Sequence, residues 1–439
     1  MIDAPHVVSR GFTGRRNPES AKLPPGQYLE TGFPVMSVGP TPAVGTGTWE
    51  FTITTETGEQ HRWDWREFTS LPAEEVTRDI HCVTKWSKLG TKWRGVSLDT
   101  LLANVTTGAS YVMAESADGY TTNLPLDDLR GGRAWVAFEH DGGPLAPEHG
   151  GPARLIVPHL YFWKSAKWVT GLRLMRDDEP GFWEDLGYHD YGDPWREQRY
   201  RGAIGVWRAA TVTATREETA TARTIILDAP GLPEHLAGQQ VDVKLTAADG
   251  YSAQRSYSIA SAPDAGRLEL TVQRIDGGEL SPYLTRELRP GDQLEVRGPI
   301  GGSFAWEPDT DSAPLLLIAG GSGIVPLMSM IRANKRRVPA RLIYSVRAPA
   351  DIIYASELSE RINATPLDVT FCYTREAPPG APVGRVSAEV IAAAAFPPGD
   401  KPAIFACGPT GFVETASSLL IAAGHDPSAI RTERFGPTG

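Results

Sequence analysis

LLLIAGGSGIVP, at residues 315–326, is the stretch that decides the fold of the C-terminal half. Its continuous apolar run predicts a strand buried on both faces, and the glycines that follow predict a tight turn into a helix. Three more apolar runs follow: RLIYSV at 341–346, DVTFCY at 368–373 and AIFACG at 403–408. Helix-like stretches separate them at 324–334, 355–363 and 411–423. This alternation predicts a doubly wound parallel α/β domain over 307–439.

The preceding hundred residues have a different pattern, in which short runs alternate polar and apolar side chains. These runs are TVTAT at 211–215, RTIILDA at 223–229, VDVKL at 241–245, RLELTVQRI at 267–275 and DQLEVRGP at 292–299. Their spacing, with glycine and proline between them, predicts an antiparallel β-barrel over 201–306.

A change of composition near residue 200 marks the N-terminal domain, for which we take residues 1–200. Ten of the twelve tryptophans precede this point. The aromatic, polar stretch 181–200 shows little periodicity and is interpreted as an extended connector that packs on a surface. The remaining pieces mix strand-like runs with short helices, so the class is α+β, but periodicity alone does not give the fold.

Composition and charge exclude several classes of protein. The formal net charge of −10 argues against nucleic acid as the main partner, and no apolar run approaches the ~18 residues of a membrane span. No apolar stretch follows Arg15 and Arg16, so we expect no export signal. Three widely spaced cysteines exclude a disulfide scaffold or a cysteine-ligated cluster. A cytoplasmic protein is expected, with its oligomeric state open.

Four motifs of the C-terminal half have residue types that suit a flavin and a nicotinamide nucleotide. A guanidinium such as Arg255 pairs with phosphate, and Tyr257 and Ser258 can bracket a flat ring. Glycines and free N–H groups at a helix start suit a diphosphate. The residues concerned are Gly278 and Ser281, then Gly320, Gly321 and Gly323, then Cys407, Gly408 and Pro409. Taken singly, each motif could instead be an ordinary strand, a simple turn or a buried structural cysteine.

Together and in this order, the motifs resemble those of the ferredoxin–NADP⁺ reductase family. The match rests on RSYS at 255–258, GGELS at 277–281, GGSGIVP at 320–326 and CGPTG at 407–411. The resemblance implies that residues of the first two motifs hold FAD and that the last two bind NAD(P)H. No ferredoxin-type cysteine set follows Phe435, so the electrons are expected to leave the flavin for another acceptor.

Three arginines predict which nucleotide is preferred. Arg347 follows the second strand of the nucleotide domain, Arg375 follows the third, and Arg385 comes shortly after. Converging guanidiniums suit the 2′-phosphate of NADP, with surface solvation as the plain alternative and NAD as the other nucleotide.

Residues of the N-terminal half would not identify a cofactor by themselves. Cys82 is the only cysteine there, and a lone cysteine is usually a small buried hydrophobe. His149 would ordinarily be a loop histidine, and Lys164 and Lys167 a solvated face.

The same half nevertheless resembles the molybdopterin domain of the sulfite oxidase family. The matching pieces include Phe33-Pro34-Val35, the His-Cys pair at 81–82, DGYTTNLP at 118–125, PLAPEHGGPARLIVP at 144–158 and WKSAKW at 163–168. The resemblance implies that Cys82 ligates molybdenum. Residues near the pterin and its phosphate would then be His81, Tyr120, His149, Lys164, Ser165 and Lys167.

Departures from the family fall in the expected substrate pocket. The arginine that binds sulfite in the family is replaced by Glu30, and the active-site tyrosine by Phe138. Lys85 is the nearby cation that could compensate. The pocket therefore suits a small neutral substrate better than a dianion.

The sequence predicts an NAD(P)H-dependent molybdo-flavoenzyme. Electrons would pass from the nucleotide through the flavin to molybdenum, which would remove an oxygen atom from an S-oxide or N-oxide. Three alternatives stay open: a nitrate reductase-like enzyme without a haem domain, substrate oxidation with NAD(P)⁺ as acceptor, and a reductase subunit with a metal-free docking domain.

Overall fold

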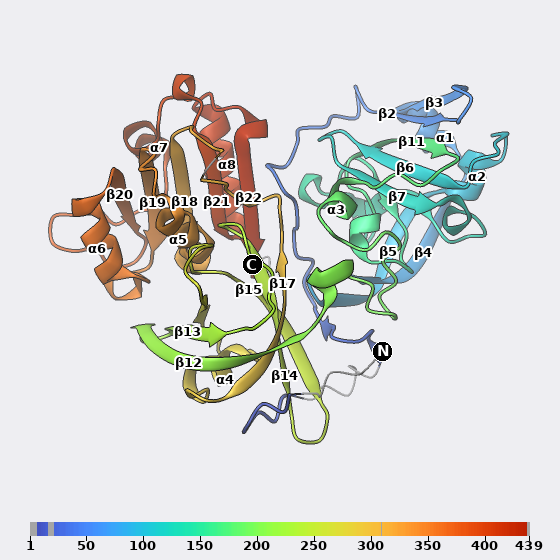
Figure 1. The fold of residues 1–439 in the computed structure, drawn as a ribbon. Helices are drawn as coiled ribbons and strands as arrows, with labels where there is room; N and C mark the ends of the chain where they lie inside the picture. The colour runs from blue at the N-terminus through green and yellow to red at the C-terminus, as the bar shows by residue number, and fades with distance from the viewer. Residues whose placement is uncertain (1–6, 16–21, 309, 437–439) are drawn as a thin grey trace. The chain divides into compact units, whose positions relative to one another are not determined.

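The structure is a computed structural model that describes residues 7–15, 22–308 and 310–436 (Figure 1). It divides into two compact units. One contains residues 22–33 and 41–205, and the other contains residues 206–436 together with 7–15 and 34–40. The domain limits 1–200, 201–306 and 307–439 stay a prediction, because the units divide the N-terminal residues differently. No helix in the described residues is long and apolar enough to cross a membrane.

The N-terminal unit is built on two sheets that enclose one hydrophobic core. The first has the order β3-β2-β11-β6-β7, with strands Gln60–Asp64, Glu50–Thr54, Val169–Met175, Tyr111–Ser116 and Thr121–Pro125. The second contains β1 (Tyr28–Leu29), β4 (Ala73–His81), β5 (Trp86–Ser97), β8 (Trp135–His140), β9 (Gly143–Pro144) and β10 (Arg154–Ile156). Short helices α1 (Trp65–Ser70), α2 (Leu98–Leu102) and α3 (Phe182–Asp185) connect and flank them. The α+β class is confirmed.

The stretch 181–200 is not the surface connector that its composition predicts. It contains α3, and both Glu184 and Arg199 are fully buried within the N-terminal unit. Glu184 accepts hydrogen bonds from Trp163 Nε1 at 2.8 Å and from Thr122 Oγ1 at 3.2 Å. The sequence of this stretch shows no periodicity because buried polar groups, and not a regular apolar face, fix it to the rest of the unit.

The predicted antiparallel barrel is confirmed in the second unit. Six strands pair in the order β15-β14-β17-β12-β13-β16. Their bounds are Ser252–Ser258, Gln240–Thr246, Gln293–Ile300, Arg208–Thr219, Ala222–Asp228 and Leu268–Gln273. A bridge between Ile259 and Leu270 joins the two end strands and closes the sheet on itself. The short helix α4 (Ser281–Arg286) packs against it.

The predicted parallel α/β domain is also confirmed. Its sheet has the order β20-β19-β18-β21-β22, with every pair parallel. The strands are Leu367–Tyr373, Ala340–Val346, Leu315–Gly320, Ala403–Pro409 and Ile430–Phe435. The helices are α5 (Ile324–Ala333), α6 (Ala355–Ala364), α7 (Ala388–Ala394) and α8 (Thr410–Ala422). Every residue of the central strand β18 is buried, as its apolar run requires.

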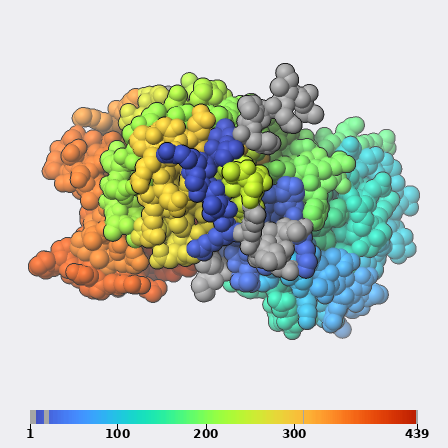
Figure 2. All heavy atoms as spheres, turned by 90° about the horizontal axis from the view of Figure 1, so that it is seen from below, coloured from blue at the N-terminus to red at the C-terminus, as the bar shows by residue number. Residues whose placement is uncertain are grey.

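Two N-terminal segments belong to this second unit, which the sequence did not predict. Residues 7–15 lie on the barrel: the Ser9 N–H donates to Thr246 O at 2.8 Å, and Phe12 joins the barrel core. Figure 2 shows this dark blue segment lying across the yellow and green atoms of the barrel. Residues 34–40 instead run alongside β22. The Thr432 N–H donates to Val38 O at 2.8 Å, and Arg434 Nη1 donates to Ser37 O at 2.7 Å.

Candidate functional sites

Cys82 lies at the tip of the β4–β5 hairpin, where the chain makes a tight turn over residues 82–85. The Cys82 N–H donates to Trp86 O at 2.8 Å, and the Lys85 N–H donates to Cys82 O at 3.0 Å. Lys85 completes the turn in the left-handed region, at φ 82°. The turn buries both side chains, with Cys82 6% and Lys85 0% exposed. Cys82 Sγ lies 3.1 Å from Thr84 Oγ1.

Side chains from distant parts of the sequence hold this turn. Gln27 Nε2 donates to Cys82 O at 3.0 Å, and Gln27 Oε1 accepts from Ser87 Oγ at 3.2 Å. Ser87 Oγ also lies 2.8 Å from His81 Nδ1. Burial lowers the pKa of His81 to about 4, so its ring is neutral at pH 7. Arg199 Nη1 donates to Val83 O at 2.7 Å. The predicted pair His81–Cys82 is thus fixed in position by hydrogen bonds.

The charge state of the Cys82 thiol depends on two opposing effects. Burial is the largest effect and raises the pKa of the thiol above its ordinary value, and the Thr84 hydrogen bonds and the cations Arg199 and Lys85 oppose it only in part. Among the described residues, no group of three or more His, Cys, Asp or Glu side chains is arranged to hold a metal ion. A metal bound at Cys82 would therefore take its other ligands from a cofactor.

A cluster of rings lies beside the hairpin turn, centred on Phe33. Phe33 stacks on His149 with ring centroids 4.0 Å apart and planes at 4°. Its other ring neighbours are His140 at 5.0 Å, Trp93 at 6.0 Å, Phe162 at 6.1 Å and Trp86 at 6.2 Å. Burial, together with Lys167 and Arg154, lowers the pKa of His149 to about 3.

Three polar atoms in the Phe33 cluster favour a ligand here. His149 Nδ1, His140 Nε2 and Trp86 Nε1 are buried and have no hydrogen-bond partner among the described residues. Buried polar groups are nearly always hydrogen-bonded, so such orphans need a partner from outside the protein. Beside the buried thiol of Cys82, they fit a flat polar group such as a pterin.

Four of the six residues predicted near the pterin and its phosphate are already engaged by the protein. Lys164 Nζ, fully buried, contacts Asn123 O at 2.7 Å, Asn123 Oδ1 at 2.8 Å and Glu184 Oε1 at 2.6 Å. Ser165 Oγ accepts from Val157 N at 2.9 Å, Tyr120 OH donates to Trp163 O at 2.6 Å, and Lys167 Nζ donates to Glu148 O at 2.7 Å. Lys164 has only three protons, so it could reach a phosphate only by losing one of these contacts.

The predicted substrate pocket needs a correction at Phe138. Register along β5 and β8 shifts between the pairs Arg94–Glu139 and Gly95–Ala137, so Phe138 is an extra, bulged residue. Its ring lies in the same hydrophobic core as Val136, two residues before it, and packs on Trp65 and Phe68. Phe138 therefore does not join Trp86 in the Phe33 cluster.

Glu30 and Lys85, the other two predicted pocket residues, follow the backbone of the hairpin turn. The Glu30 N–H donates to Ser87 O at 2.8 Å, which places residue 30 beside β5. Its carboxylate accepts from the Gly32 N–H at 2.9 Å. The structure thus brings Glu30 and the Cys82 turn to the same strand, with Lys85 buried in the turn itself.

The flavin motif lies at the end of β15, which carries Arg255, Tyr257 and Ser258. Arg255 Nη2 lies 3.5 Å from Glu279 Oε2, so the barrel strand and the glycine turn at 277–281 are neighbours. A Cβ on Gly278 would lie 2.9 Å from Ser281 Oγ and 3.0 Å from Ile275 O. Gly278 is therefore tightly packed, and Gly277 beside it has φ 81°, so the turn favours glycine at both positions, as suits a turn near a diphosphate.

The two nucleotide motifs meet at one edge of the parallel sheet. A Cβ on Gly323 would lie 2.1 Å from Cys407 O, and one on Gly320 would lie 2.7 Å from the Phe412 ring. A Cβ on Gly408 would lie 2.8 Å from the Phe412 ring and 3.1 Å from Gly320 Cα. Gly321 has φ 55°, which favours glycine. The motif predicted to hold the pyrophosphate and the motif predicted to face the nicotinamide are thus in backbone contact.

Cys407 and its neighbour on β22 form a buried pair. Cys407 is 0% exposed and pairs with Glu433 across the two strands. Pro409 ends β21 two residues later. Burial raises the pKa of Glu433 to about 7, and its Oε2 atom has no hydrogen-bond partner among the described residues. No motif of the sequence gives Glu433 a role. Its burial beside Cys407 makes it a candidate site residue.

The backbone segments that carry the three predicted arginines lie near the carboxyl ends of β19 and β20. The Arg375 N–H donates to Arg347 O at 2.9 Å, which joins the two loops. Val383 forms a β-bridge with Tyr373, the last residue of β20. Arg385 follows two residues after Val383 and is therefore close to the end of this strand. Arg375 and Arg385 are exposed, whereas Arg347 forms an ion pair with Asp351 at 3.0 Å.

Comparison with known proteins agrees with this arrangement. Three family models match in order: an oxidoreductase molybdopterin binding domain at 38–183, an oxidoreductase FAD-binding domain at 210–306 and an oxidoreductase NAD-binding domain at 317–418. The uncharacterized oxidoreductase YuiH of Bacillus subtilis is 41% identical over 189 residues, which are 42% of this chain and 96% of YuiH. The chain belongs to the molybdopterin-binding oxidoreductases.

This molybdopterin oxidoreductase carries a ferredoxin reductase-type module as its second half. The glycine betaine monooxygenase reductase subunit of Pseudomonas aeruginosa is 34% identical over 234 residues, or 51% of this chain. The chain spans 62% of that subunit's length. The crystal structure of the Amycolatopsis cytochrome P450 reductase GcoB has a TM-score of 0.50 at 20% identity, covering 89% of this chain and all of that one, and shows the fold alone. Both recognised resemblances are confirmed, as are the cofactor classes molybdopterin, FAD and NAD(P).

The buried ion pair of Lys164 and Glu184 gives a first test. Lys164→Met should leave Glu184 charged and buried, and should lower the free energy of unfolding of the cofactor-free protein by about 3–5 kcal/mol. The double variant Lys164→Met/Glu184→Gln should recover part of this loss, and Lys92→Met, on an exposed lysine of β5, should change little. Chemical denaturation measures the effect. Unchanged stability together with lost pterin would instead make Lys164 a cofactor ligand only.

Proposed function

We propose that this molybdopterin- and flavin-dependent oxidoreductase is an NAD(P)H-driven reductase that removes an oxygen atom from a neutral S-oxide or N-oxide. The observation that carries the proposal is the Phe33 ring cluster beside the Cys82 turn. Aromatic walls favour an organic substrate, and Glu30 next to the turn disfavours a dianion such as sulfite. Because Phe138 does not lie in the pocket, the preference for a neutral substrate rests on Glu30.

The residues that would hold the cofactors can be named. Cys82 would be the protein ligand of molybdenum, with His149 and Trp86 available to the pterin. Arg255 and Tyr257 would hold the flavin, and the glycine turn at 320–323 the nucleotide. When bound, the flavin accepts a hydride from NAD(P)H and molybdenum exchanges an oxygen atom with the substrate.

The protein's own contribution is to fix these groups and their charges. Thr84 donates toward or accepts from the Cys82 sulfur at 3.1 Å, and Arg199 anchors the backbone of the same turn. His81 stays neutral and bonded to Ser87, so it orients the turn rather than transferring a proton. Carrying both halves on one chain raises their effective concentration for each other, to about millimolar for short linkers.

Cys82→Ser tests the metal ligand. We expect this variant to lose molybdenum and substrate turnover, because a serine hydroxyl is a poor ligand for a soft metal site. Flavin reduction by NADPH should stay at the wild-type rate, since the flavin motifs lie on the other unit. Metal analysis and anaerobic flavin bleaching measure the two properties. Cys372→Ser, at another buried cysteine, is the control, and full activity with full metal content in Cys82→Ser would contradict the assignment.

Arg375→Ala tests the nucleotide preference. Loss of a guanidinium that binds the 2′-phosphate should raise the KM for NADPH by about 10- to 100-fold, as expected for a charged hydrogen bond. The KM for NADH should change less than about twofold, because NADH has no such phosphate. Arg336→Ala, at an exposed arginine after α5, controls for general surface charge. Equal effects of Arg375→Ala on both nucleotides would remove the preference.

Steady-state kinetics on the fully metallated enzyme tests the substrate class. With NADPH as the electron donor, methionine sulfoxide or an N-oxide should be reduced. Sulfite oxidation with ferricyanide as the acceptor should be at least about tenfold slower than this reduction. A factor of ten in rate corresponds to about 1.4 kcal/mol of transition-state binding. Glu30→Arg should shift the ratio toward sulfite. Nitrate is included as a further substrate. Rapid sulfite oxidation without oxide reduction would contradict the proposal.

A further inference from the structure

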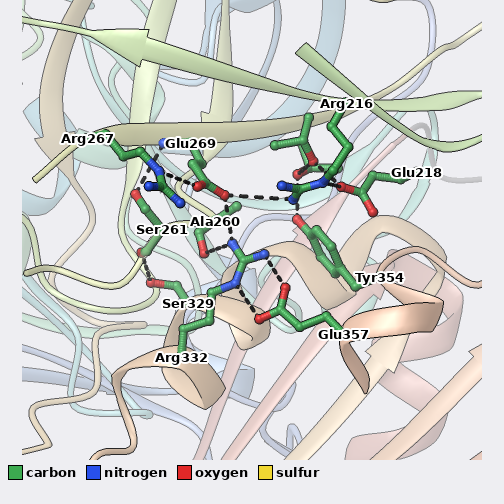
Figure 3. Close-up of polar contacts among 12 residues, drawn as sticks. Arg216, Glu218, Ala260, Ser261, Arg267, Glu269, Ser329, Arg332, Tyr354 and Glu357 are labelled. Atoms are coloured by element: carbon green, nitrogen blue, oxygen red, sulfur yellow. Dashed lines mark hydrogen bonds and ion pairs between the residues drawn. The ribbon is translucent and has the colours of Figure 1, made fainter. Parts of the chain in front are cut away.

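Helix α5 is tied to the flavin-binding barrel at the end opposite its glycine turn. The helix starts directly after residues 321–323 and carries Arg332 in its last turn. Arg332 Nη1 donates to Ala260 O at 2.8 Å and to Glu269 Oε2 at 3.1 Å (Figure 3). Ala260 comes two residues after Ser258, the last residue of the flavin motif. One side chain thus connects the nucleotide helix to the segment that continues the flavin strand.

A second contact of α5 reaches the next carbonyl of the same segment. Ser329 Oγ donates to Ser261 O at 2.7 Å. Ser329 and Arg332 are three residues apart and lie on one face of the helix. Their two hydrogen bonds to consecutive carbonyls hold both the position and the rotation of α5 relative to the barrel.

Glu357 of helix α6 and Glu269 of strand β16 also bind Arg332. We call the four residues Arg332, Ser329, Glu269 and Glu357 the Arg332 clamp. Glu357 receives Arg332 Nε at 3.0 Å and Nη2 at 2.5 Å. Glu269 also accepts from Arg267 Nε at 2.7 Å. Arg332, Glu269 and Glu357 line a cavity of about 300 Å³, and the side chain of Arg332 is only 11% exposed.

The clamp residues leave the guanidinium no freedom to bind a separate ligand. Burial alone opposes the charge of Arg332, but Glu357 and Glu269 outweigh it and hold its pKa above the ordinary value. The same contacts lower the pKa of Glu357 despite its burial. A charge held this firmly between two carboxylates suits a structural connection and not an anion site.

We infer that Arg332 is a positioning residue, which sets the distance between the nicotinamide and the flavin. A ten-residue helix is about 15 Å long and stiff, so a change at its last turn moves the glycine turn at its start. Flavin reduction moves one hydride, with its two electrons, from the dihydronicotinamide to the flavin and leaves NAD(P)⁺. That transfer needs reacting atoms about 3–3.5 Å apart, so small shifts of α5 slow it strongly. The inference concerns this half-reaction only and does not depend on the proposed oxide substrate.

Stopped-flow flavin reduction by NADPH and by 4-deuterated NADPH, on the holoenzyme without oxygen, tests the clamp. In Arg332→Gln the limiting rate should fall by about 10- to 100-fold, while the Kd for NADPH changes less than about threefold. The primary isotope effect should change, because the donor–acceptor distance changes. Arg332→Lys should recover part of the rate. Arg361→Gln is the matched control, since Arg361 binds Glu357 in the same cavity but only along α6, and it should stay within about twofold of wild type.

Several outcomes would overturn the inference. A wild-type rate and isotope effect in Arg332→Gln would do so, as would equal slowing in Arg361→Gln. If Arg332→Gln does not fold, Ser329→Ala carries the test, with a rate decrease of up to about tenfold and the same change in isotope effect. A Ser329→Ala enzyme that matches wild type in both would then count against the clamp.

Discussion

Backbone contact between the glycine turn after β18 and the end of β21 constrains the whole nucleotide domain. A Cβ on Gly323 would lie 2.1 Å from Cys407 O and 2.9 Å from Gly408 N, closer than real side chains come. Only glycine allows this approach, and it fixes the direction in which α5 leaves the sheet. Because β18 and β21 are neighbours, the motifs that follow them share one sheet edge. The path of α5 in turn decides where Arg332 meets the barrel.

The C-terminal half could be predicted almost completely from sequence, for a physical reason. Strands buried on both faces must be apolar throughout, and β18 is apolar at all six positions. Turns that approach a phosphate or another backbone must be glycine, so the glycines at 320–323 and 277–278 mark the site as well as the fold. The proximity of the segments that carry Arg347 and Arg375 also followed from topology, since loops after neighbouring parallel strands meet.

The N-terminal half was harder, because its geometry depends on contacts that leave no local pattern. Arg199 reaches Val83, 116 residues away, and Glu184 receives Lys164 and Trp163 from another loop. Local composition predicted a surface connector there, since charged residues are usually exposed. The bulge at Phe138 shows the same limit at the scale of one residue. The extra residue shifts the register from the pair Gly95–Ala137 to the pair Arg94–Glu139, and no local pattern of the sequence predicts this shift.

The buried cations of the N-terminal unit influence the electrostatic potential around Cys82. Arg154 donates to His149 O and Ser165 O, both at 2.8 Å, and Arg199 donates to Val83 O and Pro25 O. Carbonyl oxygens accept from these guanidiniums without neutralising their charge. Arg199 Nε also lies 3.7 Å from Glu197 Oε1, so the positive potential of Arg154 is the less compensated of the two. Such a potential opposes protonation of the Cys82 thiol, whose pKa burial alone raises. It also favours an anionic phosphate nearby. The same arginines that hold the loops in place therefore make this buried region more favourable to a negatively charged cofactor than an apolar core of the same shape would be, although burial still keeps the pKa of the Cys82 thiol raised.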